Sequence, residues 1–400
     1  MTPDDTLTGS TRLLSAAQAA EQLGVSKATL YAYVSRGLLS AVPHASDPRA
    51  RCYSSFEVAS LARRKGQGRK REQQTLAALG EGWPVLDSAL SSIQDGQPVY
   101  RGQRVLALAQ HATLEDIARL LWQFGEHDPF AAPAPVLSKR WQRVAAELSE
   151  HRLAERTLAL LALGLGEVQG AAWLADGPAL ALACGQHLRL AMACFTGQPP
   201  STAPLHQQLA RAWGLPRQAD EPLRQALVLV AEHEMNMVAF TARGLASVGD
   251  SLGSALLGAM CNLTATFSGG APEQVEALWD ELLAQPKLRP ALAARLDRGD
   301  GLPGFNHLSY PAGDPRATRL LALAKGLAPL PAIAIEAEKL MGAKPALDFG
   351  LVALRRALGA PRDAALAILM AGRCVGVVAH ILEQRRSGQR IIARARYVGP

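Results

Sequence analysis

Apolar residues recur along most of the chain at the spacing of amphipathic helices. Val105, Leu108 and Ala112 share one helical face, and Thr113 is placed to cap the helix that follows. Similar patterns recur at 137–165, 177–195, 222–247, 251–266, 272–284, 316–341, 346–358 and 361–386. Alternation with a period of two, which is typical of strands, is scarce apart from short pieces near 92–101. From about residue 75 onward the chain is therefore predicted to be mainly α.

The first 65 residues have a different pattern, of short helices and a wing-like hairpin. Ser15, followed three residues later by Gln18, predicts a capping box at the start of one helix. Ser26 is placed to cap a second helix, which Gly37 ends. Turn residues between 43 and 53 separate short extended pieces and predict a small β-wing. Two short helices joined by a brief turn are typical of a winged helix-turn-helix domain.

The formal net charge of +7 lies mostly at this end of the chain. Residues 1–71 hold eleven Lys and Arg residues against five acidic ones, which is a net charge of +6. Such asymmetry indicates an end that faces nucleic acid, attached to a nearly neutral body. The charged run R-R-K-G-Q-G-R-K-R-E-Q-Q (63–74) lies largely within a predicted basic linker, 66–84. A merely solvated tether is the alternative for this run.

Several protein classes are disfavoured by composition. The longest apolar stretches, such as 157–166, fall short of the roughly 20 residues that a membrane span needs. The N-terminus lacks the basic start and apolar run of a signal peptide. The cysteines are odd in number and without CxxC spacing, so neither a zinc site nor a disulfide framework is indicated: Cys52, Cys184, Cys194, Cys261 and Cys374. The sequence predicts a cytoplasmic protein with no membrane partner and no bound metal.

Residues 12–65 resemble the helix-turn-helix domains of MerR-type regulators and of short excisionase-like proteins. The matching residues are S-A-A-Q-A-A-E-Q-L-G-V-S-K-A-T-L-Y-A-Y-V-S-R-G-L-L, then R-x-Y and F-E-V-A-S-L. The resemblance implies that the second helix enters the major groove of double-stranded DNA. Its implied contacts, with two on the wing that touch phosphate, are Lys27, Thr29, Tyr31, Arg36, Arg49 and Arg51. A helical hairpin that only docks onto the rest of the protein is the alternative for residues 1–65.

Segments from about residue 85 to residue 400 together resemble the citrate synthase family. In chain order they include S-S-I-Q-D-G-Q-P-V-Y-R-G (91–102), E-H-E-M-N (232–236), F-T-A-R (240–243), S-G-G-A-P-E-Q-V (268–275), G-F-N-H-L-S-Y-P-A-G-D-P-R-A (304–317), L-D-F-G (347–350) and G-R-C-V-G-V-V-A-H-I-L-E-Q (372–384). Any one motif is weak, but their ordered conjunction is specific. The resemblance implies a two-domain helical fold, with a large domain at 85–235 and 341–400 and a small domain at 236–340.

The reaction of this family explains why such residues are needed. A carboxylate removes a methyl proton from acetyl-CoA, one donor stabilises the enol, and a second donor polarises the carbonyl of a 2-oxo acid. By resemblance, Asp348 is the base and His307 polarises the carbonyl. His233 and Arg373 are implied to bind the oxo acid. The alternatives are a helix N-cap for Asp348 and a buried structural ion pair for Arg373.

The resemblance also implies a loop that contacts CoA. Gly304, Phe305 and Asn306 would approach CoA, which is a substrate and not a bound cofactor, with their backbone. Arg316 would orient this loop. A homodimer is implied as well, with 177–195 and 251–266 as candidate dimer surfaces or, equally, as core helices.

The departures from the family pattern are as informative as the matches. Ser268 stands at the catalytic position where the family has its enol-stabilising histidine, and it offers one shorter donor. Leu308 and Ile392 stand where the family has carboxylate-binding arginines. Two interpretations stay open. One is a divergent enzyme that condenses acetyl-CoA or another short acyl-CoA with a 2-oxo acid. The other is a catalytically weak or inactive metabolite sensor that acts as a DNA-binding regulator.

Overall fold

The computed structural model describes residues 13–36, 38–43, 51–55, 57–58, 61–62, 86–168, 177–264, 271–392, 397 and 399. The chain divides into two compact units, one of residues 1–87 with 271–357 and one of residues 88–270 with 358–400. Both are mainly helical, as predicted, and the described strands form two three-stranded sheets. The predicted linker 66–84 lies outside the described residues.

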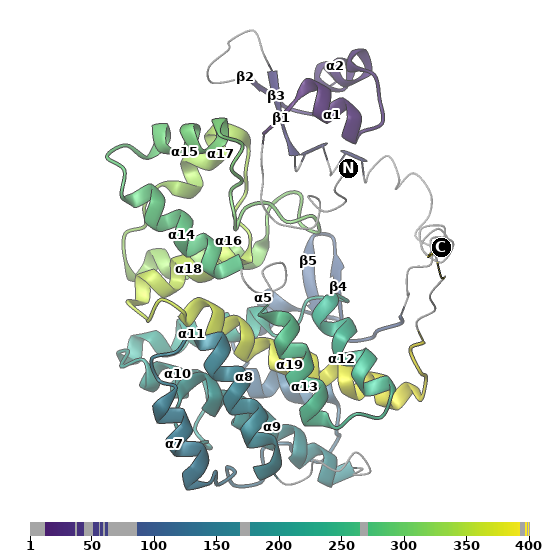
Figure 1. Cartoon of the computed structure of the whole chain (residues 1–400), viewed down its shortest axis with the longest axis vertical. Helices are drawn as coiled ribbons and strands as arrows, with labels where there is room; N and C mark the ends of the chain where they lie inside the picture. The colour runs from purple at the N-terminus through teal and green to yellow at the C-terminus, as the bar shows by residue number, and fades with distance from the viewer. Residues whose placement is uncertain are drawn as a thin grey trace. The chain divides into compact units, whose positions relative to one another are not determined.

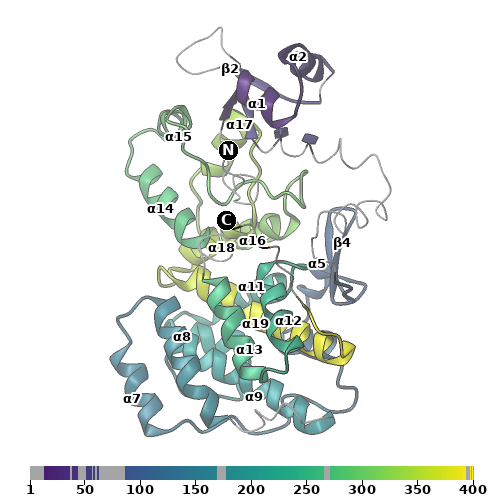
Figure 2. The same ribbon diagram turned by 45° about the vertical axis from the view of Figure 1, so that its right-hand side comes forward.

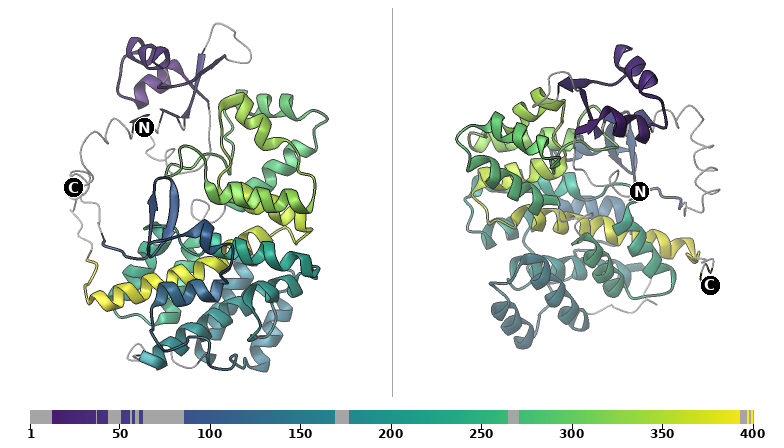
Figure 3. Two further views of the ribbon diagram at one scale, coloured as in Figure 1. Left: turned by 180° about the vertical axis from the view of Figure 1, so that it is seen from behind. Right: turned by 45° about the horizontal axis from the view of Figure 1, so that its top comes forward.

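The N-terminal part of the first unit is a small sheet with two helices. Its elements are β1 (Leu13–Ser15), α1 (Ala16–Gln22), α2 (Lys27–Ser35), β2 (Ala41–Pro43) and β3 (Arg51–Ser54). The strands are antiparallel in the order β1-β3-β2, and the purple helices lie together beside them (Figure 3). Both predicted caps are confirmed: Ser15 forms a capping box with Gln18, and the Ser26 hydroxyl accepts the Thr29 N–H. Strand β1 was not predicted, and it places Leu14 opposite Tyr53.

This part of the chain has its own hydrophobic core. Leu14, Leu23, Leu30, Tyr53 and Val58 are among its buried members. Burial of apolar area at roughly 25 cal/mol per Å² stabilises such a cluster. Helix α1 is thus held against β1 and β3, and α2 is held against α1 with Leu30 buried, which leaves the opposite face of α2 at the surface.

The rest of the first unit is a group of helices (Figure 2). They are α14 (Ala271–Leu283), α15 (Leu288–Asp297), α16 (Pro315–Leu327), α17 (Ile333–Met341) and α18 (Leu347–Leu358). The pattern at 316–341 predicted one helical run, but the chain breaks at 328–332, where two prolines interrupt it. Gly350 lets α18 approach α16 closely, since a Cβ there would lie 3.1 Å from the Ala317 Cα.

The second unit is built around its last helix. Its elements are β4 (Ser91–Gln94), β5 (Gln97–Tyr100), β6 (Gln103–Arg104), α5 (Val105–Leu108), α6 (Leu114–Trp122), α7 (Lys139–Glu147), α8 (Leu153–Gly164), η1 (Leu165–Glu167), α9 (Gly177–Thr196), α10 (Leu205–Ala212), η2 (Arg217–Ala219), α11 (Asp220–Val230), α12 (Met237–Ser247), α13 (Leu252–Leu263) and α19 (Ala364–Ser387). Helix α19, yellow in Figure 1, contacts α6, α9, α11, α12 and α13. Because α12 and α13 pack on α19, they belong to this unit, whereas the predicted small domain, 236–340, includes them.

Helices α9 and α19 are long and apolar enough, by length and composition alone, to cross a membrane. This corrects the expectation that every apolar stretch is too short. In the structure, 78% of the apolar window of α9 and 100% of that of α19 is buried. Their apolar side chains therefore contact other helices of the same unit.

Candidate active site

The loop that carries His307 is hydrogen-bonded to the segment that enters α18. The Asn306 N–H donates to the Lys344 carbonyl at 2.7 Å, and the Lys344 N–H donates to Asn306 Oδ1 at 2.8 Å. Asp348 is the second residue of α18, so it is not the N-cap that the alternative interpretation proposed. These bonds place His307 and Asp348 on two adjacent segments of the first unit.

The predicted CoA loop packs into the protein with its side chains. Gly304 has a φ of +79°, and a Cβ there would lie 2.5 Å from Val275 Cγ2 and 3.2 Å from the Phe349 nitrogen. Phe305 is fully buried, with its ring 4.7 Å from the ring of Phe349. The Asn306 side chain holds the loop closed. A contact with CoA would therefore come from the backbone of this loop, and it stays a prediction.

His307 is held in one tautomer by the residue two positions further on. The Ser309 N–H donates to His307 Nδ1 at 3.1 Å. A ring nitrogen that accepts a hydrogen bond carries no proton, so in the neutral ring the proton is on Nε2. His307 can thus act as a hydrogen-bond donor through Nε2, which is what a carbonyl-polarising residue requires.

His307 begins a row of side-chain contacts that ends in a buried ion pair. The centroids of the His307 and Tyr310 rings are 5.2 Å apart. The Arg316 guanidinium lies over the same Tyr310 ring, 5.1 Å from its centroid. Arg316 donates to both carboxylate oxygens of Asp314, at 3.0 and 2.8 Å, and both side chains are buried. Burial opposes ionisation of Asp314, but the positive charge of Arg316 and its hydrogen bonds outweigh burial and lower the pKa of Asp314. The predicted structural role of Arg316 is confirmed.

A second group of polar residues surrounds the break between α11 and α12. The pattern at 222–247 predicted one continuous helix, but the chain leaves the helix after Val230 and resumes at Met237. Asn236 caps the new helix by accepting the Ala239 N–H at 3.0 Å. The hydroxyl of Tyr100, on β5, lies 3.0 Å from both the nitrogen and the carbonyl oxygen of Glu232 and holds the break in place.

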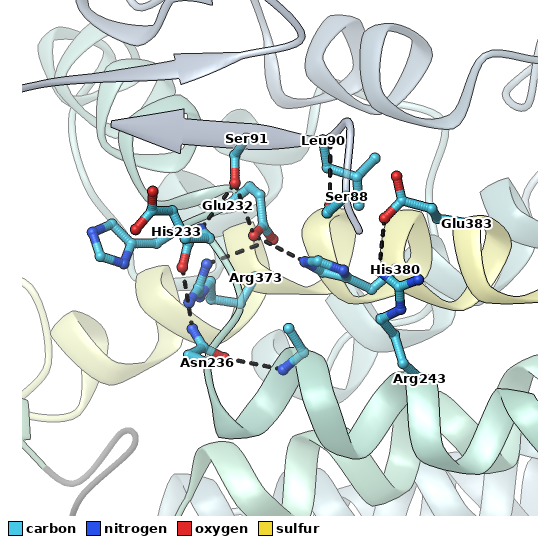
Figure 4. A network of polar contacts seen from close by, with 12 residues as sticks. Ser88, Leu90, Ser91, Glu232, His233, Asn236, Arg243, Arg373, His380 and Glu383 are labelled. Carbon is cyan, nitrogen blue, oxygen red and sulfur yellow. Dashed lines mark hydrogen bonds and ion pairs between the residues drawn. The ribbon is translucent and has the colours of Figure 1, made fainter. Parts of the chain in front are cut away.

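Glu232 is the centre of this group (Figure 4). It is only 2% exposed, and its Oε1 lies 3.1 Å from His380 Nε2. Its Oε2 lies 3.7 Å from Arg373 Nη1, and Ser91 donates to its Oε1 at 3.4 Å. Burial opposes ionisation, but the hydrogen bond from His380 and the positive charge of Arg373 outweigh it and lower the pKa of Glu232. Arg373, 9% exposed, thus forms a buried ion pair, and its contact with an oxo acid stays a prediction.

The structure brings the predicted site residues together in two pairs. His307 lies near the start of the Asp348 helix in the first unit, and His233 adjoins the Glu232–Arg373 pair in the second. The His233 ring points away from the contact between Glu232 and His380 (Figure 4). Ser268 lies outside the described residues. Glu232 and His380 lie inside the family motifs, but no role was predicted for them, because the two residues are 148 positions apart and the sequence does not show that they are partners.

A family model described as "Citrate synthase, C-terminal domain" matches residues 78–396. The chain belongs to the citrate synthase family. This confirms the family resemblance of the body of the chain, whereas the match begins after the N-terminal helices and says nothing of them.

Curated relatives of this citrate synthase family member match over part of their length. Putative citrate synthase 2 of Mycobacterium tuberculosis is 37% identical over 185 residues, which are 43% of this chain and 50% of the relative. Citrate synthase 2 of Bacillus subtilis is 32% identical over 190 residues, 45% of this chain and 51% of the relative. In these matches the chain spans about half the length of the curated relatives.

Solved structures of citrate synthases share the fold. A ternary complex of carboxymethyl coenzyme A and oxaloacetate with the citrate synthase of Thermoplasma acidophilum has a TM-score of 0.67. It is 21% identical in sequence, and the likeness covers 81% of this chain and 96% of that chain. At 21% identity this likeness shows that the two chains share a fold.

Proposed function

We propose that the chain condenses acetyl-CoA, or another short acyl-CoA, with a 2-oxo acid, and that Asp348 and His307 are its catalytic residues. The observation that supports this most is the hydrogen bond from the Ser309 N–H to His307 Nδ1. It leaves Nε2–H as a donor, on a loop that is bonded to the segment before the Asp348 helix. A carboxylate base and a neutral donor are the two groups that this chemistry needs.

The reaction follows from these groups. The Asp348 carboxylate takes a proton from the carbon next to the thioester carbonyl, which becomes an enolate, and Ser268 donates one hydrogen bond to the enolate oxygen. The enolate carbon attacks the carbonyl carbon of the oxo acid, which restores the thioester carbonyl and moves the negative charge to the oxygen of the oxo acid. His307 Nε2–H donates a hydrogen bond to that carbonyl oxygen, which takes up a proton from water and becomes a hydroxyl group, while the protonated Asp348 returns its proton to water. His233 and Arg373 bind the carboxylate. Water then hydrolyses the thioester and releases CoA.

A thiol-release assay tests this function. Purified protein receives an acyl-CoA and a panel of 2-oxo acids, with Asp348→Asn as the test variant and Asp363→Asn as the matched control, since Asp363 makes no capping bond to α19. Loss of the base should lower the rate by about 100-fold or more, and the control should keep it. All five cysteines are free and Cys261 is the exposed one, so the protein itself contributes a background of one reactive thiol. Silence across the panel contradicts the proposal.

A second candidate function is metabolite sensing coupled to DNA binding, and the surface of α2 favours it. Lys27, Tyr31 and Ser35 recur every four residues and are exposed, so they share one face, and Arg36 follows them. Leu30, fully buried, anchors the opposite face. An exposed helical face with cations at both ends suits a major groove.

The other predicted DNA contacts differ in their surroundings. Thr29 is half-buried and its hydroxyl lies 2.9 Å from that of Ser26, so it supports the helix cap. Arg51 is exposed on β3 and is suited to contact a phosphate. Arg49 lies outside the described residues. A homodimer would offer two such modules to adjacent half-sites, and light scattering measures that state.

A gel-shift titration over a range of salt concentrations tests DNA binding. The double variant Lys27→Ala with Arg36→Ala should weaken binding across all sequences and lower the salt slope by about two, because each cation releases about one counterion. Lys325→Ala, a change of the same kind on α16, should leave binding intact. Binding that survives deletion of residues 1–71 contradicts this function and supports the docking alternative.

A further inference from the structure

The Glu232 side chain is buried in the second unit, and its neighbours restrict its position. Its Oε2 lies against Gly376, where a Cβ would come within 2.0 Å. The Gly376 N–H donates to the Ala231 carbonyl at 3.1 Å, so the break after α11 is fastened to α19 at this residue. The carboxylate therefore stays beside α19, within reach of Arg373 and His380.

The charges of this group nearly cancel. His380 Nε2 faces Glu232, and His380 Nδ1 is buried with no hydrogen-bond partner among the described residues. A protonated ring would bury an unpaired N–H, which is unfavourable. In the neutral tautomer with its proton on Nε2, that nitrogen donates to Glu232 and Nδ1 has no proton that needs an acceptor. One negative charge on Glu232 then balances the one positive charge on Arg373.

A second ion pair on α19 is separate from this group. Arg243, on α12, donates to Glu383 at 2.9 Å, and Glu383 also accepts the Ala89 N–H. The Glu383 side chain is 18% exposed, and its negative charge is paired with the positive charge of Arg243. Arg373 is thus balanced by Glu232 and not by the neighbouring acid, which makes Glu383 a natural control.

We infer that Glu232 acts through Arg373 as a positioning residue that sets acceptor specificity, and that it favours monocarboxylic over dicarboxylic 2-oxo acids. The inference rests on the proposed function, in which Arg373 binds the acceptor. A cation whose charge is already balanced attracts an anion less strongly, and Coulomb attraction grows with the charge of the ligand. A doubly charged acceptor therefore loses more attraction than a singly charged one.

Steady-state kinetics with pyruvate and oxaloacetate as acceptors test this. Glu232→Gln removes the negative charge and keeps the shape. It should lower KM by about tenfold for oxaloacetate and by about threefold for pyruvate, with KM for the acyl-CoA unchanged. Structural damage would raise KM for both acceptors, so a gain of affinity separates the two causes. Glu232→Asp and Glu383→Gln should both keep the wild-type ratio of the two KM values.

Calorimetric titration with the same two acids, without acyl-CoA, makes the test independent of turnover. If Arg373→Gln leaves the affinity for both acids unchanged, the proposed role of Arg373 fails. If Arg373→Gln weakens binding but Glu232→Gln leaves the ratio of the two affinities unchanged, only the present inference is overturned. Should Glu232→Gln not fold, Ser91→Lys brings a cation to the same carboxylate and should shift the ratio in the same direction. An unchanged ratio in folded Ser91→Lys protein overturns the inference.

Discussion

At the scale of single residues, backbone hydrogen bonds orient the candidate catalytic side chains as much as side-chain contacts do. A backbone N–H, that of Ser309, selects the His307 tautomer, and the Asn306 side chain closes the loop by bonding to the backbone of Lys344. Groups held in place before the reaction lower its barrier because they need not reorganise. His307 is therefore prepared as a donor by the shape of its loop.

Removing that N–H should impair turnover more than substrate binding. We expect Ser309→Pro, which has no N–H, to lower kcat by about fivefold with a smaller change in KM, since one hydrogen bond to the ring is worth about 1 kcal/mol. Ser309→Ala keeps the N–H and should retain the wild-type kcat. Steady-state kinetics measure both variants, and circular dichroism verifies that each is folded. Equal kcat values for the two variants would refute this role of the backbone.

At the scale of elements, two glycines allow α19 to pack against the end of α11. A Cβ at Gly372 would lie 2.4 Å from Val230 Cγ2, and one at Gly376 would lie 2.4 Å from the Ala231 carbonyl oxygen. The spacing of four residues places both glycines on one face of α19. This close approach brings Glu232 to Arg373, so the element contact creates the polar group.

Gly376→Ala should destabilise the protein even though alanine favours helices. The added methyl group would meet the Glu232 carboxylate and a backbone carbonyl, and overpacking of this kind costs about 1–3 kcal/mol. Gly244→Ala, on α12, meets nothing within 4 Å and should raise stability by about 0.5–1 kcal/mol. Denaturant unfolding monitored by circular dichroism measures both. A Gly376→Ala protein as stable as wild type would show that α19 can move away.

At the scale of the whole molecule, each compact unit holds a buried carboxylate paired with an arginine. Asp314 pairs with Arg316 in the first unit, and Glu232 pairs with Arg373 in the second. The pKa of each carboxylate lies below its ordinary value, 3.8 for Asp and 4.5 for Glu. A lowered folded-state pKa stabilises the fold above the unfolded-state value, and the stability is lost as the pH falls through the folded-state pKa.

The free energy of unfolding should therefore change little through these groups from pH 7 to about 5 and fall steadily below that. Asp314→Asn should be less stable at neutral pH, because Arg316 stays buried without its partner. It should also lose less stability on acidification, because one linked proton is gone. Denaturant titrations at a series of pH values measure both effects. An acid dependence as steep in Asp314→Asn as in wild type would rule out the linkage.

Much of this protein follows from local pattern. Helix caps at Ser15, Ser26 and Thr113 were predictable because a cap involves residues three positions apart. The helical class followed from periodicity, and the family from the order of its motifs. The candidate site residues His307, Asp348 and Arg373 were likewise predicted from motifs and not from geometry, and their roles stay predictions.

The tertiary structure alone decided where long helical patterns break and which charges meet. The pattern at 222–247 continues through the break at 231–236, which is held by Tyr100 from a distant strand. Glu232 and His380 lie far apart in sequence, and only packing of α11 on α19 makes them partners. A local pattern records which face of a helix is apolar, whereas a buried carboxylate acquires its ionisation and its role from groups that only the folded chain brings to it.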